Sequence, residues 1–285
     1  MNSSAKSSQA ASQPVSHSSP HRAKKRFGQN FLVDKSYIRR IVDAIDPKPS
    51  DRILEIGPGQ AALTRELLDA ISAHCKEGET ASLDVVEIDR DLVARLKTEF
   101  TPEQLRIHEG DALEFDFATL PSPLRVVGNL PYNISSPILF RLCDYEDRIA
   151  DMTFMLQKEV VDRMAAREGE DDRGRLSVML QYRFDVVKCF DVPPGAFRPI
   201  PAVDSSIVQL KPLGEKRLRP KNERTFANIV TAAFTQRRKM IRKSLGAFAP
   251  VDAWANLNID PQARAETLSC EAFVAIADYV ATKGA

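Results

Sequence analysis

The sequence contains little cysteine and no long hydrophobic run. Its four cysteines, Cys75, Cys143, Cys189 and Cys270, lie far apart and form no Cys-x-x-Cys pair. This spacing suggests neither a zinc site nor a disulfide framework, and it favours a reducing compartment such as the cytoplasm. No stretch approaches the roughly 18 consecutive apolar residues that indicate a membrane span. We therefore expect a cytoplasmic protein without bound metal and without a membrane partner.

The sequence also lacks a strong overall charge, because its 40 Lys and Arg residues nearly balance 39 Asp and Glu residues. Such a balance normally argues against a nucleic-acid partner. The charge is unevenly distributed, however: residues 1–33 contain five basic and no acidic residues, residues 34–210 contain 22 basic and 32 acidic residues, and residues 211–245 contain 11 basic and 2 acidic residues. Two basic segments thus flank an acidic middle, which indicates either solvated faces or local surfaces for an anionic partner.

Three regions follow from the composition and the hydrophobic pattern. Residues 1–22 are rich in Ser, Ala and Gln, so they bury too little apolar surface to fold, and we predict a disordered tail. Residues 23–212 alternate short apolar runs with helical stretches and form the main predicted domain. Residues 213–285 show helical periodicity only, which predicts a small all-α domain at the end of the chain.

The main domain is predicted to be an α/β fold with a parallel sheet that is covered on both faces. The predicted strands are 52–56, 83–88, 105–108, 124–127 and 152–156, with helices at 61–71, 90–100 and 135–142. Two further strands, 185–192 and 205–210, are expected to form an antiparallel pair at the sheet edge. The C-terminal helices are predicted at 223–233, 237–245, 251–257 and 270–282.

A glycine-containing turn follows the first predicted strand. Residues 55–62 read EIGPGQAA, which matches the pattern G-x-G-x-x-A between a strand and a helix. Gly57 and Gly59 permit a tight turn and let a ligand approach the backbone closely. The pattern favours nucleotide-type binding, although an ordinary strand-to-helix turn has the same appearance.

Acidic residues follow the next two strands. Glu87 and Asp89 end the second strand. In dinucleotide-binding folds an acid at this position binds a ribose diol. The alternative role of such an acid is to cap the next helix. With two acids available, we expect Glu87 to hold a ribose and Asp89 to act as the cap. Asp111, after the third strand, is placed to accept a hydrogen bond from an adenine amino group, although acids are common in such turns.

Both NAD and S-adenosylmethionine are compatible with these features. S-Adenosylmethionine has no pyrophosphate to neutralise, and the glycine-containing turn carries Pro58 and no basic residue. This difference favours S-adenosylmethionine, and the segment after the fourth strand strengthens the choice.

The fourth strand ends in Asn129-Leu130-Pro131-Tyr132. The exocyclic amine of adenine is a poor nucleophile, because its lone pair is delocalised into the ring. Acceptors at the Asn129 side chain and the Leu130 carbonyl bind both N–H groups, which favours a pyramidal nitrogen and directs its lone pair toward a methyl donor. Leu130 precedes a proline and is therefore biased toward extended geometry, and Tyr132 is suited to stack on the base. No general base is needed, because the methylated nitrogen is a strong acid, so catalysis rests on positioning. The tetrapeptide on its own also fits a simple turn.

Several long motifs make the chain resemble the ribosomal RNA small-subunit adenine dimethyltransferase family over roughly residues 24–285. The matching segments are KRFGQNFL (25–32), EIGPG, VEID, GDA, GNLPYNISSP (128–137), LQKEV (156–160), GRLSV (174–178), FRPIPAVDSS (197–206) and FTQRRK (234–239). The resemblance implies a Rossmann-like S-adenosylmethionine-dependent methyltransferase domain with a helical RNA-binding domain. It also implies conversion of two adjacent adenosines near the 3′ end of small-subunit rRNA to N6,N6-dimethyladenosine.

The resemblance also implies roles for individual residues. Asn30 and Leu32 are expected to reach over the cofactor, and Gly57 to line its methionine part. Glu87 is implied at the ribose and Asp111 at the adenine amine, while Asn129 bridges cofactor and target base. Phe197 is implied as a second aromatic face, so that the adenine lies between Phe197 and Tyr132. From the sequence alone, packing beneath the proline-rich loop is an equally acceptable role for Phe197.

Basic residues are predicted to hold the surrounding RNA by its phosphates, because an adenine must be extracted from its helix to react. The N-terminal candidates are Lys24, Lys25 and Arg26. In the predicted helix 237–245, helical spacing places Arg238 and Arg242 on one face and Lys239 and Lys243 on an adjoining one, with Arg237 beside them. Ile241 and Leu245 are expected to face inward.

Three functions remain in competition at this point. The first is the methyltransferase, a monomer that acts on small-subunit rRNA within an immature small ribosomal subunit. The second is a non-catalytic ribosome-assembly factor with the same fold, and the third is a large-subunit rRNA adenine methyltransferase. The intact tetrapeptide and acid pair favour the first over the second, while the choice between the two subunits depends on the resemblance alone.

Overall fold

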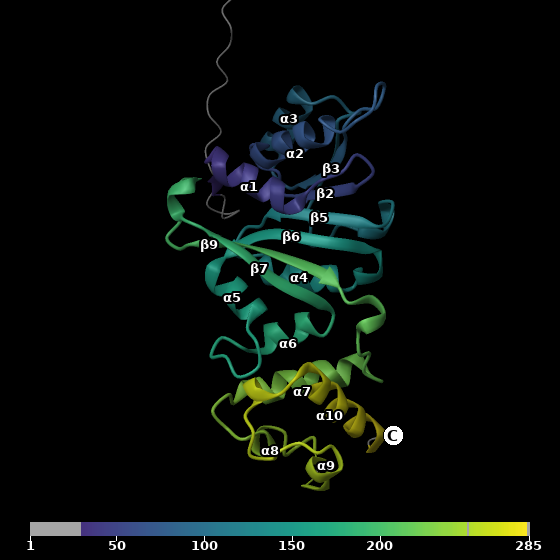
Figure 1. The fold of residues 1–285 in the computed structure, drawn as a ribbon, viewed down its shortest axis with the longest axis vertical. Coiled ribbons are helices and arrows are strands. Elements are labelled where there is room, and N and C mark those ends of the chain that lie inside the picture. Colours follow the sequence, from purple (N-terminus) through teal and green to yellow (C-terminus); the bar gives the residue numbers. More distant parts are fainter. Residues whose placement is uncertain (1–29, 250, 284–285) are drawn as a thin grey trace, which may run out of the picture.

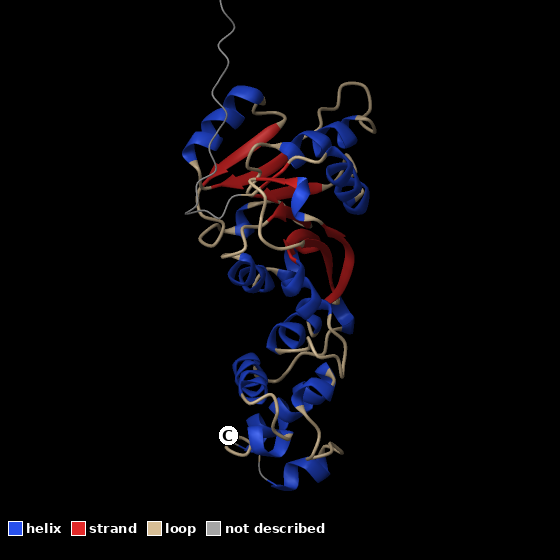
Figure 2. Cartoon of the chain, turned by 90° about the vertical axis from the view of Figure 1, so that its left-hand side faces the viewer, coloured by secondary structure: helices blue, strands red, loops and turns tan. Residues whose placement is uncertain are grey.

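The computed structural model describes residues 30–249 and 251–283, and it consists of a central sheet with helices on both sides and a helical region at one end (Figures 1 and 2). The strands are β1 (Phe31–Leu32), β2 (Arg52–Ile56), β3 (Leu83–Glu87), β4 (Leu105–Glu109), β5 (Leu124–Asn129), β6 (Ile149–Gln157), β7 (Phe184–Val192), β8 (Phe197–Arg198) and β9 (Ser205–Pro212). The α-helices are α1 (Lys35–Ile45), α2 (Ala62–Ser72), α3 (Arg90–Glu99), α4 (Ser135–Cys143), α5 (Lys158–Ala165), α6 (Arg175–Gln181), α7 (Glu223–Thr235), α8 (Ile241–Ser244), α9 (Val251–Asn256) and α10 (Cys270–Lys283).

The main sheet has the order β4-β3-β2-β5-β6-β9-β7. The first five of these strands are parallel, which confirms the predicted α/β class. The predicted antiparallel pair at the edge is confirmed as well, but β9 lies between β6 and β7 and pairs antiparallel with both. Strand β9, which comes last along the chain, is therefore an inner strand, and β7 is the edge strand. The sequence pattern did not specify this order.

Alternate residues of the central strands contact different helices, as the two-residue period of a strand requires. Ile53 and Val85 belong to the apolar cluster that includes α1 and α2, whereas their neighbours Leu54 and Val86 belong to the cluster that includes α4 and α5. Strands buried on both faces have continuous apolar runs, so the runs in this sequence follow from the layered arrangement.

Helix α1 is an element that the sequence pattern left unassigned. Its first turn is capped by Asp34, whose carboxylate accepts hydrogen bonds from the backbone N–H groups of Ser36 and Tyr37. Its apolar residues recur at helical spacing and are all buried against the sheet and α2: Ile38, Ile41, Val42 and Ile45. The helix begins three residues after β1, so its packing helps to hold β1 in place.

A small two-stranded sheet joins two distant motifs. In it, β1 pairs antiparallel with β8, with Phe31 opposite Arg198 and Leu32 opposite Phe197. The backbone N–H of Val33 also donates to the carbonyl of Ala196 at 2.9 Å. The segment before α1 is thereby attached to the loop that precedes β9.

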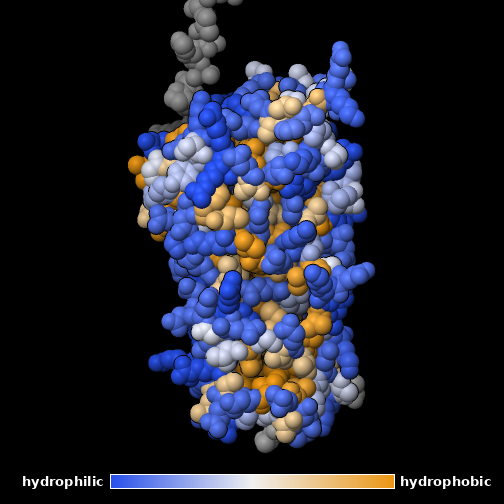
Figure 3. Space-filling model, viewed as in Figure 1, coloured by the Kyte–Doolittle hydropathy of each residue, from blue (hydrophilic) through white to orange (hydrophobic). Residues whose placement is uncertain are grey.

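The helical region has its own apolar core, which includes residues of α7, α8, α9 and α10. The same core takes in Val178 and Met179 of α6 and the neighbouring Tyr182, whose ring lies 4.4 Å from that of Phe226 between centroids. The helical region is therefore packed directly on the sheet-containing part through α6 (Figure 1). The view in Figure 3 shows polar residues over most of one face of the molecule.

One predicted helix is wrong in its extent. The sequence predicted a helix over 237–245, but α7 ends at Thr235, a turn follows, and α8 spans only Ile241–Ser244. Met240 is extended and forms an antiparallel bridge with Arg264, which interrupts helical hydrogen bonding. Five cations between positions 237 and 243 would also repel one another in a continuous helix. Consequently Arg238 and Arg242 do not share a helical face. Ile241 and Leu245 are buried, as expected.

Candidate active site

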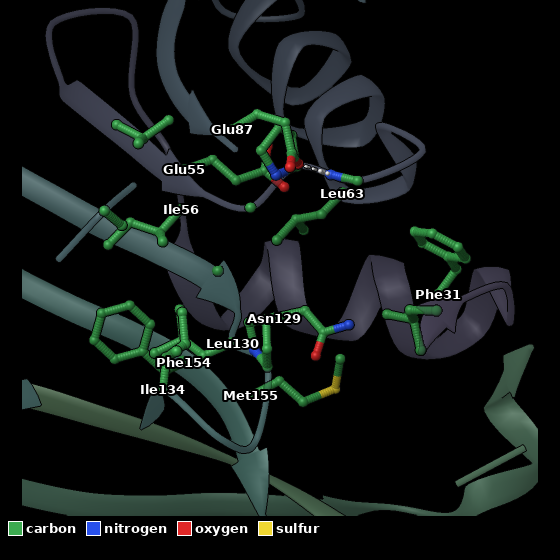
Figure 4. Close-up of a pocket in the computed structure, with 18 of the residues that line it drawn as sticks. Phe31, Glu55, Ile56, Leu63, Glu87, Asn129, Leu130, Ile134, Phe154 and Met155 are labelled. Carbon is green, nitrogen blue, oxygen red and sulfur yellow. Dashed lines mark hydrogen bonds between the residues drawn. The ribbon is translucent and has the colours of Figure 1, made fainter. Parts of the chain in front are cut away.

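A cavity of about 270 Å³ lies at the carboxyl ends of the parallel strands (Figure 4). This is the position at which open parallel sheets bind ligands. Its lining residues are Asn30, Phe31, Leu32, Ile41, Glu55, Ile56, Gly57, Pro58, Gly59, Gln60, Ala62, Leu63, Val86, Glu87, Ile88, Gly110, Asp111, Ala112, Gly128, Asn129, Leu130, Pro131, Tyr132, Asn133, Ile134, Thr153, Phe154 and Met155. All of the predicted cofactor-binding residues are among them.

The glycine-containing turn after β2 requires glycine for two reasons. Gly57 and Gly59 have φ angles of 68° and 57°, a region that other residues rarely adopt. A side chain at Gly59 would in addition place its Cβ 3.1 Å from the ring of Phe31. The turn therefore lets β1 lie close to it at the cavity.

A third glycine, Gly128 of β5, was missed as a functional position. A Cβ at Gly128 would lie 2.5 Å from the carbonyl oxygen of Ile56 on the neighbouring strand. Such an approach is impossible for any other residue without movement of the backbone. Gly128 thus keeps β2 and β5 close together where both strands reach the cavity.

Glu87, at the end of β3, is buried beneath the glycine turn. Its carboxylate accepts hydrogen bonds from the backbone N–H groups of Gly59 at 3.2 Å and Asp89 at 2.9 Å. Burial raises the pKa of Glu87, and these two hydrogen bonds oppose the increase. Asp89 accepts a hydrogen bond from the backbone N–H of Asp91 and begins α3, so its predicted capping role is confirmed.

Glu55 is a second buried carboxyl group of the cavity, and the sequence reasoning gave it no role. The hydroxyl of Thr64 donates a hydrogen bond to Glu55 at 2.6 Å. Burial raises the pKa of Glu55 to about 7, with the neighbouring Glu87 adding to the increase. An acidic residue inside an apolar strand run was the available signal, because such a residue is rarely buried without a function.

The tetrapeptide Asn129–Tyr132, which begins with the last residue of β5, forms the wall opposite Glu87 (Figure 4). The side-chain nitrogen of Asn129 donates a hydrogen bond to the carbonyl of Asn30 at 3.0 Å. This bond uses the nitrogen of the amide, so the amide oxygen is the end available to accept a hydrogen bond from a ligand. The backbone N–H of Leu130 donates to Met155 at 3.2 Å, which ties the tetrapeptide to β6.

Two further predicted residues differ in their placement. Asp111 is half-buried at the cavity, where its carboxylate accepts a hydrogen bond from the backbone N–H of Leu113 at 2.9 Å. Phe197 is only 1% exposed, packs in the apolar cluster that contains Leu32, and is not among the lining residues. The structure therefore shows the packed arrangement of Phe197, and its stacking role stays a prediction.

The match to a family model shows to which protein family the chain belongs. The model described as "Ribosomal RNA adenine dimethylase" matches residues 20–282. This chain belongs to the ribosomal RNA adenine dimethylase family.

Relatives and solved structures agree with that family. The chain is 55% identical over 93% of its length to a "Ribosomal RNA small subunit methyltransferase A" of Aromatoleum aromaticum, of which 97% is covered. A protein of the same name from Bordetella bronchiseptica is 50% identical, with 94% of this chain and 97% of that protein covered. Among solved structures, a dimethyladenosine transferase from Plasmodium falciparum has a TM-score of 0.75 at 26% identity, covering 89% of this chain and 98% of that chain. The 23S rRNA methyltransferase ErmE has a TM-score of 0.68 at 25% identity, covering 88% and 100% respectively.

The methyl donor of the dimethylase family is S-adenosylmethionine, and the chemistry of the cavity fits this ligand. Two buried carboxyl groups with raised pKa values, Glu55 and Glu87, face a cavity that no described basic residue lines. Such a site suits a cationic sulfonium compound with a ribose diol. It does not suit a pyrophosphate, which needs positive charge or a donor-rich turn.

The predicted RNA-binding residues of this family member fall into two groups. Lys24, Lys25 and Arg26 lie outside the described residues. The second group is exposed on the turn after α7 and on α8, and none of its members forms a salt bridge with a described acidic side chain: Arg237, Arg238, Lys239, Arg242 and Lys243. We refer to these five residues as the α7–α8 basic cluster.

Two kinds of feature are absent from the described residues. No group of three or more His, Cys, Asp or Glu side chains within them is arranged to hold a metal ion. None of the described helices has both the length and the apolar character that a membrane crossing requires.

Proposed function

We propose that this chain transfers methyl groups from S-adenosylmethionine to N6 of two adjacent adenosines near the 3′ end of small-subunit rRNA, forming N6,N6-dimethyladenosine. The observation that carries the proposal is the position of Asn129–Tyr132 at the carboxyl end of β5, on the wall opposite Glu87. This arrangement supports a methyl donor and an adenine in adjoining parts of one cavity.

Residues on the β2–β4 side of the cavity are suited to hold the methyl donor. Glu87 and Asp111 both line the cavity. Glu87 is suited to accept hydrogen bonds from ribose hydroxyls, and Asp111 to accept one from an adenine amine. Gly57 and Gly59 keep the turn free of side chains beside the ligand. When bound, S-adenosylmethionine supplies the methyl group from its cationic sulfur.

Residues at the end of β5 and directly after it are suited to bind the target base. The amide oxygen of Asn129 and the carbonyl of Leu130 accept the two N–H groups of the adenine amine, which weakens conjugation of its lone pair with the ring. Tyr132 lines the same part of the cavity and offers an aromatic face for stacking. Because the methylated nitrogen is strongly acidic, it loses its proton to water, and the rate depends on alignment.

The α7–α8 basic cluster supports RNA as the substrate. A base enters such a cavity only when it is extracted from its helix, and the flanking RNA must then be held through its backbone. The five cations are exposed and form no salt bridge with a described acidic side chain, although Arg237 donates a hydrogen bond to the backbone carbonyl of Asp171. Such cations are suited to bind phosphates. We further propose that the protein works in the cytoplasm as a monomer on immature small ribosomal subunits.

The test is methylation of defined substrates with labelled S-adenosylmethionine, followed by nucleoside analysis. Immature small subunits, large-subunit rRNA and DNA are compared under the same conditions. We expect label in N6,N6-dimethyladenosine of small-subunit rRNA only. Label in large-subunit rRNA or DNA would overturn the assignment of the substrate, and binding of small subunits without any label would favour a non-catalytic assembly factor.

A further inference from the structure

The ring of Tyr132 is attached to the sheet at its far end. Its hydroxyl lies 2.9 Å from the hydroxyl of Ser205, within hydrogen-bonding distance, although the two residues are 73 positions apart. Tyr132 is half-buried at the cavity, whereas Ser205 is 1% exposed. A buried hydroxyl without a partner would lose its hydrogen bonds to water, so this pairing is favoured.

Ser205 is a rigid point of attachment. It is the first residue of β9, the strand that lies between β6 and β7. Its Cα pairs with Gln157 on one side and with Val192 on the other. Strand pairing on both sides holds the backbone of Ser205, so the position of its hydroxyl is set by the sheet rather than by the preceding loop.

We propose that Ser205 is a positioning residue that fixes the orientation of the Tyr132 ring for stacking with the target adenine. A hydrogen bond at the tyrosine hydroxyl fixes where the far end of the ring lies, which restricts the first side-chain torsion. Because the hydrogen-bonding directions of a phenol oxygen lie close to the plane of its ring, the bond also favours one orientation of the ring about the second torsion, and it leaves both ring faces free. A fixed ring plane sets the plane of the stacked base and thereby the direction of its N6 lone pair. The inference rests on the proposed function, because it assigns Ser205 to the same reaction.

Ser206 provides a matched control for Ser205. It is the next residue of β9 and is also buried, but its hydroxyl donates to Asp191 at 2.5 Å and not to Tyr132. Successive side chains of a strand point to opposite faces, so the two serines differ in direction while they share the same strand. Replacement of either residue by alanine removes one buried hydroxyl from the same part of the sheet.

The experiment is a double-mutant cycle with Ser205→Ala and Tyr132→Phe. The first readout is kcat for rRNA methylation. The second is the quenching of 2-aminopurine fluorescence, with 2-aminopurine placed in the RNA at the target position. We expect each single variant to lower kcat about fivefold, the scale of one neutral hydrogen bond, and the double variant to be no slower than either. The KM for RNA should stay unchanged, because phosphate contacts elsewhere dominate RNA binding. Quenching of 2-aminopurine should weaken in parallel with kcat. Ser205→Thr should restore kcat, and Ser206→Ala should leave kcat and quenching at the wild-type value.

Several results would overturn the inference. These are wild-type kcat in Ser205→Ala, multiplicative losses in the double variant, or equal losses in Ser206→Ala. A wild-type protein that methylates no rRNA contradicts the proposed function instead. In that case the double-mutant cycle is repeated with the free energy of unfolding as the measured quantity. Non-additive effects of the two substitutions support a contact between the hydroxyls, and additive effects contradict it.

Discussion

At the scale of single residues, the carboxyl groups of the cavity control its electrostatics. Glu55 is 2% exposed and Glu87 is 5% exposed, and burial raises the pKa of both. In the absence of a cation the protein bears the cost of keeping these groups ionised at neutral pH. A cationic ligand favours the ionised forms, so the same arrangement that destabilises the free protein favours binding of the methyl donor.

The first prediction concerns the pH dependence of stability through Glu55. Its pKa in the folded state is about 7, above the ordinary value of 4.5, so its contribution to stability is complete below pH 4.5 and is lost as the pH rises toward 7. Glu55→Gln removes this titration while it retains an acceptor for the Thr64 hydroxyl. At pH 8 we expect the free variant to be more stable than wild type by up to about 3 kcal/mol, with little difference at pH 4.5.

Urea unfolding of both proteins across this pH range measures the difference. A stability difference between wild type and variant that does not change with pH would contradict the raised pKa. Because a cation favours the ionised carboxylate, wild type should also bind S-adenosylmethionine more tightly than Glu55→Gln above pH 7, which calorimetry checks independently of activity.

Some site residues were predictable from the sequence and others were not, for identifiable reasons. Gly57, Gly59 and Glu87 stand at fixed positions relative to a strand and a helix, so local pattern was sufficient to place them at the cavity. Gly128 depends on the approach of a neighbouring strand, and the burial of Phe197 depends on the pairing of β8 with β1. Both are contacts between distant segments, which local pattern does not contain.

At the scale of helices and strands, the elements that were predicted are again those with a strong local sequence pattern. The strands β2 to β6 and helices α2 to α4 carry continuous or periodic apolar runs, so they were found. Helix α1 precedes the first strong strand, α5 has charged residues at half of its positions, and α6 is only seven residues long, so these helices were not assigned. The helix over 237–245 was predicted from spacing alone, and the bridge of Met240 to Arg264 prevents it.

A group of ion pairs attaches the start of α7 to the sheet-containing part. Glu146, after α4, is 8% exposed and interacts with Arg183 at 2.7 Å and with Arg217. Both arginines also contact Glu223 in the first turn of α7. We refer to Glu146, Arg183, Arg217 and Glu223 as the polar junction. It lies beside the apolar contact of Tyr182 with the helical region, so the two together fix α7 relative to the sheet.

The second prediction concerns the polar junction. Glu146→Ala leaves the side chain of Arg217, which is 3% exposed, without its buried carboxylate partner. Removal of one partner from a buried ion pair costs about 3–5 kcal/mol, and we expect a loss of stability of this size. The neighbouring Asp147→Ala is the control, because Asp147 is 80% exposed and contacts Arg219 only at 3.4 Å.

Denaturant unfolding of both variants gives the comparison. Equal stability of Glu146→Ala and Asp147→Ala would contradict a structural role for the junction. If Glu146→Ala still folds, its KM for rRNA should rise more than that of Asp147→Ala, because the α7–α8 basic cluster would no longer be held at a fixed position relative to the cavity.

At the scale of the whole molecule, the distribution of charge matters more than its sum. The acidic middle of the sequence contributes the carboxylates of the cavity, whereas the basic segment 211–245 contributes the α7–α8 basic cluster in the helical region (Figure 1). A net charge of +1 therefore coexists with a cation-binding cavity and a surface suited to phosphates.

The third prediction tests this separation through salt dependence. Each phosphate contact by Lys or Arg contributes about one unit to the slope of log affinity against log salt concentration. Arg238→Ala combined with Lys239→Ala should weaken RNA binding and reduce that slope by about two. The control is Arg95→Ala with Lys97→Ala on α3, which removes the same charge from an exposed site near the opposite end of the molecule (Figure 1). Equal effects of the two pairs would contradict a localised RNA surface.

The proposed role of Asn129 is to align the adenine amine for methyl transfer. The most direct measurement is the single-turnover rate of N6 methylation by Asn129→Ala on immature small subunits, with the unfolding temperature and S-adenosylmethionine affinity measured in parallel. We expect a folded protein whose methylation rate falls about 100-fold or more, which is the scale of effect when one preorganised polar contact to a reacting group is removed. A folded Asn129→Ala protein that forms dimethyladenosine at the wild-type rate would contradict this role.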